Sequence, residues 1–315
     1  MTGDAMAGDA LAGDALDGGV VGFVGLGNMG IPMTRRLVAA GYQVRGFDTS
    51  AEAIRNFTAI DGGDRGGGVT VVTELGSVGD GAAAVILMLP DSDVVEYVLL
   101  SAGLLAALPT GSTVIDMSSS DPARTRVLAE RTAANGVTLI DAPVSGGVAG
   151  ARAGTLAVMV GGPAAAFERF RPMLSAIGAR VVHAGDVGAG HAVKALNNLM
   201  SAGHLLLSSE ALIAGQRFGL DPAVMLEIIN AASGRSASTE NKWPNYVLTE
   251  KYDAGFAIRL MVKDLKLALG IEHATGVPAL ASEAVLTTWE AALADLPPDS
   301  DHTTIARWLG ERSGP

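Results

Sequence analysis

The amino-acid sequence predicts an α/β domain built on a doubly wound, mainly parallel sheet, followed by an all-α domain. From residue 20 onward, short apolar runs alternate with helical patterns, as in parallel strands connected by helices. The runs are apolar at nearly every position, which favours strands buried on both faces of a sheet. After about Gly188 only helical patterns follow. We therefore expect a disordered tail at 1–19, the sheet domain at 20–187 and the helical domain at 188–315.

The first 19 residues are not expected to fold. They repeat a five-residue unit, GDAMA, GDALA and GDALD, and glycine at every fifth position opposes both helix and strand. No basic segment precedes an apolar core, so the pattern of a signal peptide is absent. These features predict a disordered tail.

The composition limits the classes of function. The chain has 315 residues, 49% of them hydrophobic, which suffices for two domains with cores of their own. Its 22 basic and 33 acidic residues give a net charge of -11, which disfavours nucleic acid and anionic membranes as partners. The lack of cysteine excludes disulfides and thiolate metal sites, and no apolar run reaches membrane-spanning length. We expect a cytoplasmic protein.

The individual elements follow from apolar runs bounded by turn residues. The expected strands are 20–25, 42–47, 69–72, 83–89, 113–117, 137–141, 156–161 and 180–184. The expected helices are 31–40 in the first domain and 190–218, 222–232, 260–275 and 278–293 in the second. The glycine-rich segment 61–68 is expected to be a surface insertion. Residues 234–236 and 241–244 are expected between helices, either lining a substrate entrance or as plain polar loop.

A glycine-rich turn follows the first strand. Gly25, Gly27 and Gly30 form the pattern G-x-G-x-x-G between that strand and the first helix. The first glycine permits a tight turn, the second lets a pyrophosphate approach the backbone, and the third lets the helix pack on the strand. Phosphate charge would meet the helix N-terminus. The expected cofactor contacts in this turn are Gly25, Leu26, Gly27, Asn28, Met29 and Gly30.

Asp48 closes the second strand, 23 residues after Gly25. A carboxylate at this place can bond the two hydroxyls of an adenosine ribose and repels a 2′-phosphate. No arginine follows at 49–51. The pattern predicts NAD as the cofactor, with NADP disfavoured, and the alternative is a glycine-rich turn with a capping aspartate.

Two loops at the carboxyl ends of later strands are further candidates, because open α/β sheets bind ligands at this edge. Leu89 and Pro90 can pass under the cofactor, and Ser119 lies in the loop 117–122. Ser and Asp before a helix are also ordinary N-caps. Both interpretations of these loops stay open.

Ser145, Gly146 and Gly147 follow another strand end. A serine before two glycines exposes consecutive backbone N–H groups, which can hold a carboxylate without a cation. We expect a substrate carboxylate there. A tight turn into the next helix is the alternative.

The helix expected at 190–218 carries one polar stripe, which includes Lys194, Asn198 and Ser201. We expect this helix to be almost wholly buried, with Gly190 leaving room for a ligand. A buried lysine is costly unless it is paired, hydrated or lowered in pKa from about 10.4, and a desolvated lysine can exchange protons at neutral pH. From this helix alone, proton chemistry by Lys194 and a lysine that snorkels to solvent are both open.

Four segments stand out in order along the chain: GFVGLGNMG, DAPVSGG, the G-x-x-x-K-x-x-x-N of Gly190, Lys194 and Asn198, and Lys263-Asp264-Leu265. Together they resemble segments of the β-hydroxyacid dehydrogenase family. The resemblance extends over about 20–309 and is nearest to the 3-hydroxyisobutyrate dehydrogenases. It implies a Rossmann domain joined to an all-helical domain, and a homodimer or homotetramer.

The resemblance also implies roles for single residues. Lys194 would be the catalytic residue, and Asn198 would help to hold the substrate. Ser119 would lie near the nicotinamide, and Lys263 would contact the cofactor. The residues that would contact the substrate carboxylate are Ser145, Gly146 and Gly147.

The expected function is that of an NAD-dependent oxidoreductase that interconverts a small 3-hydroxy acid and its semialdehyde, with Lys194 as proton donor and acceptor. The substrate bears a carboxylate, and no metal is required. The alternatives are a tartronate-semialdehyde or sulfonate-semialdehyde reductase, an imine reductase, and a non-catalytic dinucleotide-binding scaffold. Relatives of the last two kinds are expected to lack the lysine, so its presence discriminates against them.

Overall fold

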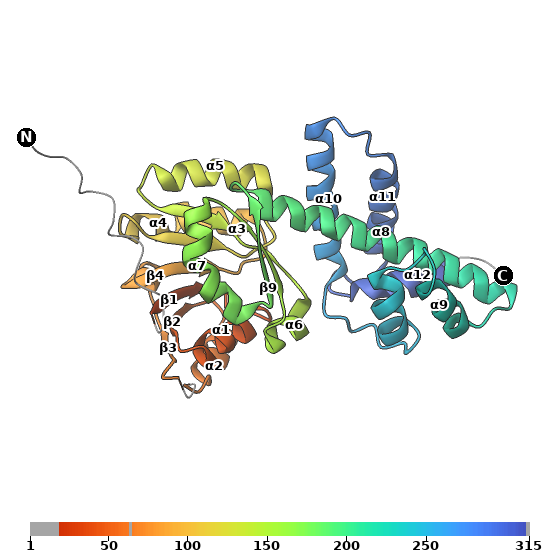
Figure 1. Ribbon diagram of the computed structural model, residues 1–315, viewed down its shortest axis with the longest axis horizontal. Helices are drawn as coiled ribbons and strands as arrows, with labels where there is room; N and C mark the ends of the chain where they lie inside the picture. Colours follow the sequence, from red (N-terminus) through yellow and green to blue (C-terminus); the bar gives the residue numbers. More distant parts are fainter. Residues whose placement is uncertain (1–18, 63–64, 313–315) are drawn as a thin grey trace, which may run out of the picture. The chain divides into compact units, whose positions relative to one another are not determined.

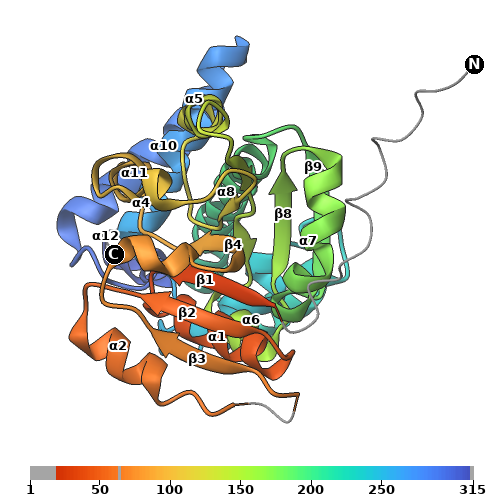
Figure 2. The same ribbon diagram turned by 90° about the vertical axis from the view of Figure 1, so that its left-hand side faces the viewer.

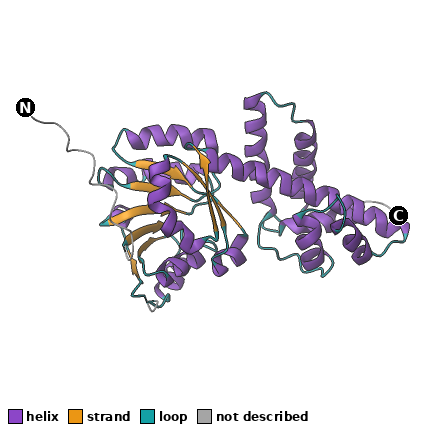
Figure 3. Ribbon diagram, viewed as in Figure 1, coloured by secondary structure: helices purple, strands orange, loops and turns teal. Residues whose placement is uncertain are grey.

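The computed structural model describes residues 19–62 and 65–312, which form two compact units that divide between Gly190 and His191. This division falls three residues after the expected boundary. The expected tail lies outside the described residues except for Gly19. Figure 1 colours the elements along the chain, and Figure 3 shows that the strands belong to the first unit while the second consists of helices.

The first unit contains the predicted doubly wound sheet, with strand order β3-β2-β1-β4-β5-β6-β8-β7 and with β9 paired to β8. The strands from β1 to β6 pair in parallel, and β8 is antiparallel to β6. Figure 2 shows β1 between β2 and β4, the point at which the order of the strands reverses. The strands are β1 (Val20–Val24), β2 (Gln43–Phe47), β3 (Gly68–Val71), β4 (Ala82–Leu87), β5 (Thr113–Asp116), β6 (Thr138–Asp141), β7 (Val144–Ser145), β8 (Ala157–Gly161) and β9 (Arg180–Gly185). In open α/β sheets this reversal point is where ligands bind.

Helices cover both faces of the sheet. Alternate side chains of the central strands enter two different cores: Ile86 and Ile115 pack with α1, α2 and α7, while Val85 and Val114 pack with α3, α4 and α5. The helical segments are α1 (Gly30–Ala39), α2 (Ala51–Thr58), η1 (Leu75–Gly79), α3 (Ser92–Glu96), η2 (Tyr97–Ser101), α4 (Leu104–Ala107), α5 (Pro122–Ala133), α6 (Gly147–Ala153) and α7 (Ala164–Ile177). The central strands are buried on both faces, as their continuous apolar runs predicted.

The second unit consists of helices around one apolar core that includes Trp243, Trp289 and Trp308. The segments are α8 (Ala189–Phe218), whose first two residues belong to the first unit, α9 (Pro222–Asn230), η3 (Ser238–Val247), α10 (Ile258–Thr275), α11 (Leu280–Asp295), η4 (His302–Thr304) and α12 (Ile305–Arg312). In the described part of the chain, no helix has the length and apolarity needed to cross a membrane.

Two expectations for the second unit are wrong. Residues 241–244 are helical, within the π-type helix η3, and not a loop between helices. Burial of Trp243 and Val247 in the core explains this, since tertiary packing outweighs the local signal of Pro244.

The expectation that α8 is almost wholly buried is also wrong. Val193, Met200 and Leu207, spaced by seven residues, are 44%, 62% and 64% exposed. Apolar residues occupy all faces of this helix, so composition does not indicate which face packs against the core. Lys194, on another face, is buried.

Candidate active site

The three glycines after β1 occupy three different environments. Gly25 has φ +96°, and a Cβ atom on it would lie 2.2 Å from the carbonyl oxygen of Met88. A Cβ atom on Gly30 would lie 2.0 Å from the carbonyl oxygen of Gly25. A Cβ atom on Gly27 would meet nothing within 4 Å. The first and third glycines therefore permit the turn and the close packing of α1, while the second leaves open space beside the backbone.

Asp48 anchors this turn. Its Oδ2 accepts a hydrogen bond of 2.6 Å from the backbone N–H of Leu26, and its Oδ1 accepts one of 2.7 Å from Ser50. An ionised carboxylate has about four acceptor positions. Two acceptor positions and a negative charge thus remain for a ligand with hydroxyl groups.

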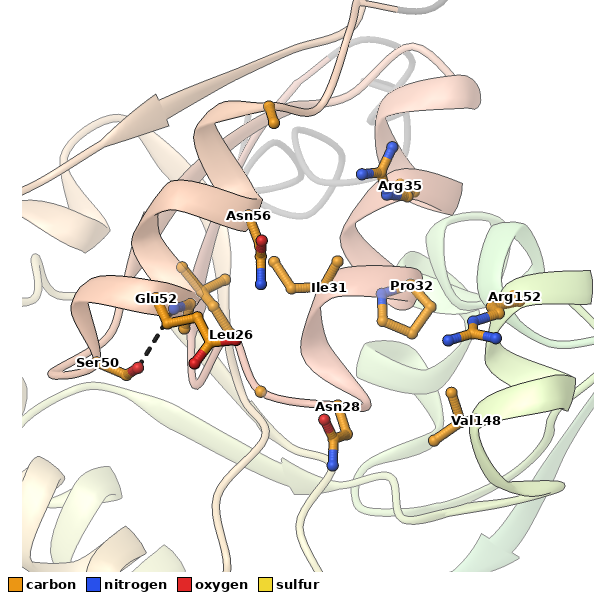
Figure 4. Close-up of a pocket in the computed structure, with 13 residues that line it drawn as sticks. Leu26, Asn28, Ile31, Pro32, Arg35, Ser50, Glu52, Asn56, Val148 and Arg152 are labelled. Carbon is orange, nitrogen blue, oxygen red and sulfur yellow. Dashed lines mark hydrogen bonds between the residues drawn. The ribbon is translucent and has the colours of Figure 1, made fainter. Parts of the chain in front are cut away.

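A pocket of about 870 Å³ lies beside the glycine turn (Figure 4). Its walls come from the turn, the outer face of α1, the length of α2 with its two caps, and α6. In Figure 4, Arg35 and Arg152 lie toward one side of the pocket and Ser50 and Glu52 toward the other. The residues around the turn thus leave room for a ligand of the size of a nucleoside and fit a dinucleotide.

Hydrogen bonds join the two loops at the ends of β4 and β5. The N–H of Leu89 donates to Oγ of Ser118 over 3.0 Å. Asp116 in turn accepts from the N–H of Ser118 over 2.9 Å and from Oγ of Ser120 over 2.8 Å. Ser118 and Ser120 are buried, whereas Ser119 between them is half-buried. Among the three serines, Ser119 is therefore the one that a ligand can reach.

The segment Ser145–Gly147 forms the end of β7 and the start of α6. Gly146 and Gly147 have φ values of +130° and +61°, a conformation that favours glycine. Ser145 and Gly147 are half-buried and Gly146 is exposed. The two-residue strand β7 was missed by the sequence analysis because Pro143 and the glycines surround it.

Asp141, on β6, ties the start of α8 to the sheet. Its Oδ1 accepts a hydrogen bond of 2.6 Å from the N–H of Gly188. A Cβ atom on Gly190 would lie 2.2 Å from the carbonyl oxygen of Met159. Gly190 therefore permits close packing of α8 on β8, which corrects the expectation that it leaves room for a ligand.

Lys194, on α8 in the second unit, is only 8% exposed. Burial lowers its pKa, the carboxylate of Asp264 acts to raise it, and the ammonium of Lys263 acts to lower it. A snorkelling lysine is excluded by this burial. The amine of Lys194 is therefore easier to deprotonate than an exposed lysine.

Asn198 lies one turn after Lys194. Its Nδ2 donates a hydrogen bond of 2.6 Å to Oδ2 of Asp264, which is 1% exposed, and its Oδ1 accepts one of 3.2 Å from Asn197. Because a carboxylate can only accept, this bond fixes the orientation of the Asn198 amide. Nζ of Lys263 lies 3.5 Å from Oδ1 of Asp264. Asp264 thus interacts with three predicted site residues: it accepts a hydrogen bond from Asn198, lies near the ammonium of Lys263 and acts electrostatically on Lys194.

Sequence reasoning missed four polar residues that position others: Asp116, Ser118, Asp141 and Asp264. Each is buried. Asp264 stands beside Lys263 in the K-D-L segment, so an acidic residue in an apolar helix face was the available signal. In the described part of the chain, no group of three or more His, Cys, Asp or Glu residues could hold a metal ion.

Two family models match this chain. Residues 20–185 match the family model described as the NAD binding domain of 6-phosphogluconate dehydrogenase. Residues 188–309 match the one described as NAD-binding of NADP-dependent 3-hydroxyisobutyrate dehydrogenase. Together the two models cover nearly all of the described residues.

Individual relatives extend the comparison. The 3-hydroxyisobutyrate dehydrogenase of Pseudomonas aeruginosa is 41% identical over 272 residues, which cover 83% of this chain and 89% of that protein. The 2-(hydroxymethyl)glutarate dehydrogenase of Eubacterium barkeri is 39% identical over 259 residues, with 82% and 84% covered. A solved structure described as Mycobacterium tuberculosis 3-hydroxyisobutyrate dehydrogenase with L-serine has a TM-score of 0.85 at 32% identity and covers 94% of this chain and 99% of its own. The chain therefore belongs to the β-hydroxyacid dehydrogenase family and is an NAD-binding oxidoreductase.

Proposed function

We propose that this protein interconverts a small 3-hydroxy acid and its semialdehyde, with NAD as the cofactor and Lys194 as the proton donor and acceptor. The observation that carries the proposal is the burial of Lys194 beside Asp264 and Asn198 in a chain of this family. Burial stabilises the neutral amine of Lys194 relative to the ammonium, and the negative charge of Asp264 stabilises the ammonium. Both protonation states can therefore be populated. A group that can hold either state is suited to proton transfer.

In oxidation, the neutral amine of Lys194 accepts the hydroxyl proton as the hydroxyl-bearing carbon loses its hydride. In reduction, the ammonium polarises the aldehyde carbonyl and returns the proton. The bound nicotinamide supplies the hydride acceptor or donor. The amide of Asn198, fixed by Asp264, retains one N–H that can orient the substrate.

The names of the relatives suggest the class of substrate. 3-Hydroxyisobutyrate, 2-(hydroxymethyl)glutarate and L-serine all carry a CH₂OH group on the carbon next to a carboxylate. We expect the same unit in the substrate of this protein. The backbone N–H groups of Ser145, Gly146 and Gly147 are our candidates for holding that carboxylate.

NAD is preferred over NADP in this proposal because Asp48 is anchored at the glycine turn. The other proposed cofactor contacts are Leu89, Pro90, Ser119 and Lys263. A dinucleotide-binding scaffold without activity is disfavoured, since a buried lysine would have no role to offset its cost.

A homodimer or homotetramer is also proposed. The exposed apolar side chains of Val193, Met200, Leu207 and Phe218 lie on α8 at spacings of seven or eleven residues, and thus on one face of the helix. Light scattering of the purified protein tests the mass of the assembly, and a monomer at micromolar concentration refutes the proposal.

The function is tested with a panel of 3-hydroxy acids and semialdehydes, followed by absorbance of the reduced cofactor, with NAD and NADP in parallel. The panel includes 3-hydroxyisobutyrate, L-serine, tartronate semialdehyde and a sulfonate semialdehyde. Turnover restricted to acids with a CH₂OH group on the carbon next to the carboxylate, and to the semialdehydes that correspond to such acids, supports the proposal. Turnover of cyclic imines without any hydroxy acid overturns it.

A further inference from the structure

The second unit holds another amine that is partly removed from solvent, that of the half-buried Lys242 in η3. Its Nζ donates a hydrogen bond of 2.8 Å to Oγ of Ser201 on α8. Lys194, Asn198 and Ser201 are spaced by four and three residues, so helical geometry places them on one face of α8. Ser201 lies two turns, or roughly 10 Å, beyond Lys194 along the axis. Lys242 therefore adds a second positive charge to the polar face that bears Lys194.

The ammonium of Lys242 has more N–H donors than it has hydrogen-bond acceptors in the described part of the chain. A lysine ammonium carries three N–H donors, and in the described part of the chain Oγ of Ser201 is its acceptor. The carboxylate of Asp301 acts on Lys242 electrostatically but already accepts hydrogen bonds from the N–H groups of Gly255 and Thr303. A partly desolvated cation with N–H donors left over is suited to an anionic oxygen ligand.

We propose that Lys242 and Ser201 bind a second anionic group of the substrate, so that this enzyme favours a 3-hydroxy acid whose C2 substituent ends in a carboxylate. The inference rests on the proposed function, since Lys194 marks the reacting end of the helix face. A C2 substituent of two methylenes and a carboxylate, with a hydrogen bond of about 3 Å at each end, covers on the order of 10 Å. This length is of the same order as the rise of the helix backbone from Lys194 to Ser201.

The charge of Lys242 depends on pH in the functional range. Burial lowers its pKa to about 8, against the opposing effect of Asp301. The groups that face it from α8 and from the start of η4 are the hydroxyl of Ser201, the carboxylate of Asp301, which caps η4, and the imidazole of His302. As pH rises through 8, Lys242 loses its charge and the affinity for a second anionic group falls. An arginine in its place stays charged throughout.

The test compares kcat/KM for 2-(hydroxymethyl)glutarate and for 3-hydroxyisobutyrate in the wild type and in Lys242→Met and Lys242→Arg variants. We expect Lys242→Met to lower the ratio of the two values by roughly 10- to 100-fold, the scale of a lost charged hydrogen bond, and Lys242→Arg to preserve most of it. Lys266→Met is the matched control, because Lys266 is an exposed lysine of the same unit paired with Glu290. An unchanged ratio in Lys242→Met overturns the proposal, whether both kcat/KM values are kept or both fall by the same factor.

Binding of glutarate separates this inference from the proposed function, because glutarate has two carboxylates and no hydroxyl to oxidise. Calorimetry with the NADH-bound enzyme is expected to show binding that weakens from pH 7 to pH 9 in the wild type and not in Lys242→Arg. If no 3-hydroxy acid is turned over but glutarate binding still requires Lys242, the proposed function fails and the subsite stands. If hydroxy acids are turned over and glutarate binds equally well to Lys242→Met, the subsite is refuted and the proposed function stands.

Discussion

Asn198 of α8 donates a hydrogen bond of 2.6 Å to the buried carboxylate of Asp264 on α10. The two residues are 66 positions apart in the sequence. The same carboxylate acts on Lys194, whose pKa it raises against the effect of burial. One acidic side chain thus orients the amide and adjusts the charge of the lysine.

Asp264→Asn is expected to move the pH profile of the enzyme. Without the carboxylate, the pKa of Lys194 falls further, so the acidic limb of kcat/KM for oxidation shifts to lower pH. Loss of the charged hydrogen bond to Asn198 is expected to lower kcat/KM by about tenfold. Lys263→Met removes a positive charge that lowers the pKa of Lys194. Under saturating cofactor, this variant is expected to shift the acidic limb of the pH profile to higher pH. Unmoved limbs in both variants contradict this account.

Lys194→Ala is expected to lower kcat by about 10² or more, the usual scale for a general acid-base group. The fold and NAD binding should persist, because the variant removes a buried amine and leaves the first unit untouched. Steady-state kinetics, thermal unfolding and titration with NAD measure the three properties. Lys266→Ala serves as the control for removal of a lysine. Near-normal turnover of Lys194→Ala would exclude Lys194 from the mechanism.

Gly27→Ala is expected to weaken NAD binding, and Gly30→Ala is expected to lower the stability of the fold. A methyl group on Gly30 would meet the carbonyl oxygen of Gly25 at 2.0 Å, so overpacking should destabilise the fold by about 1–3 kcal/mol. A methyl group on Gly27 meets nothing within 4 Å, so stability should be kept. The NAD affinity of Gly27→Ala should fall by at least about tenfold, because the pyrophosphate needs the space that the methyl group would fill. Denaturant unfolding and NAD titration distinguish the pair, and equal affinity in Gly27→Ala and wild type would refute the role of Gly27.

Asp48→Asn is expected to reduce the preference for NAD. The amide can still accept the hydrogen bond from Leu26, while the charge that repels a 2′-phosphate is gone. We expect the ratio of kcat/KM for NADP to that for NAD to rise by roughly tenfold. Asp80→Asn controls for the lost charge, since Asp80 is an exposed partner of Arg45 at 3.8 Å. A wild type that prefers NADP would contradict the assignment at the outset.

Asp301→Asn is expected to make stability less dependent on pH. Burial acts to raise the pKa of Asp301, but hydrogen bonds from His302 and Thr303 outweigh it and hold the pKa well below its usual value. A carboxyl with a depressed pKa stabilises the fold above its unfolded value of about 3.9, and this contribution is lost as pH falls further. Thermal unfolding between pH 7 and pH 3 should therefore show a shallower decline in the variant than in the wild type. Parallel declines would show that Asp301 does not contribute in this way.

The parts of the fold that were predicted correctly depend on short segments. The strands of the sheet and the glycine turn after β1 follow from residues within one strand-turn-helix unit. The hydrogen bond from Leu26 to Asp48 was not predicted, and the role of Asp48 toward a ribose stays a prediction. The two-residue strand β7 and the helical segment η3 were not found, because distant packing and pairing stabilise them against local turn signals.

By itself, the sequence determined the order of strands and helices, the glycine turn and the presence of one lysine in an apolar helix, since backbone preference and hydrophobic periodicity act over a few residues. The tertiary structure alone decided that Lys194 is buried while Val193 and Met200 are exposed. It also decided that Asp264 meets Asn198 and that Lys242 meets Ser201. Burial and hydrogen bonding between separate helices depend on which faces pack together, and an α8 that is apolar on most sides does not specify that choice.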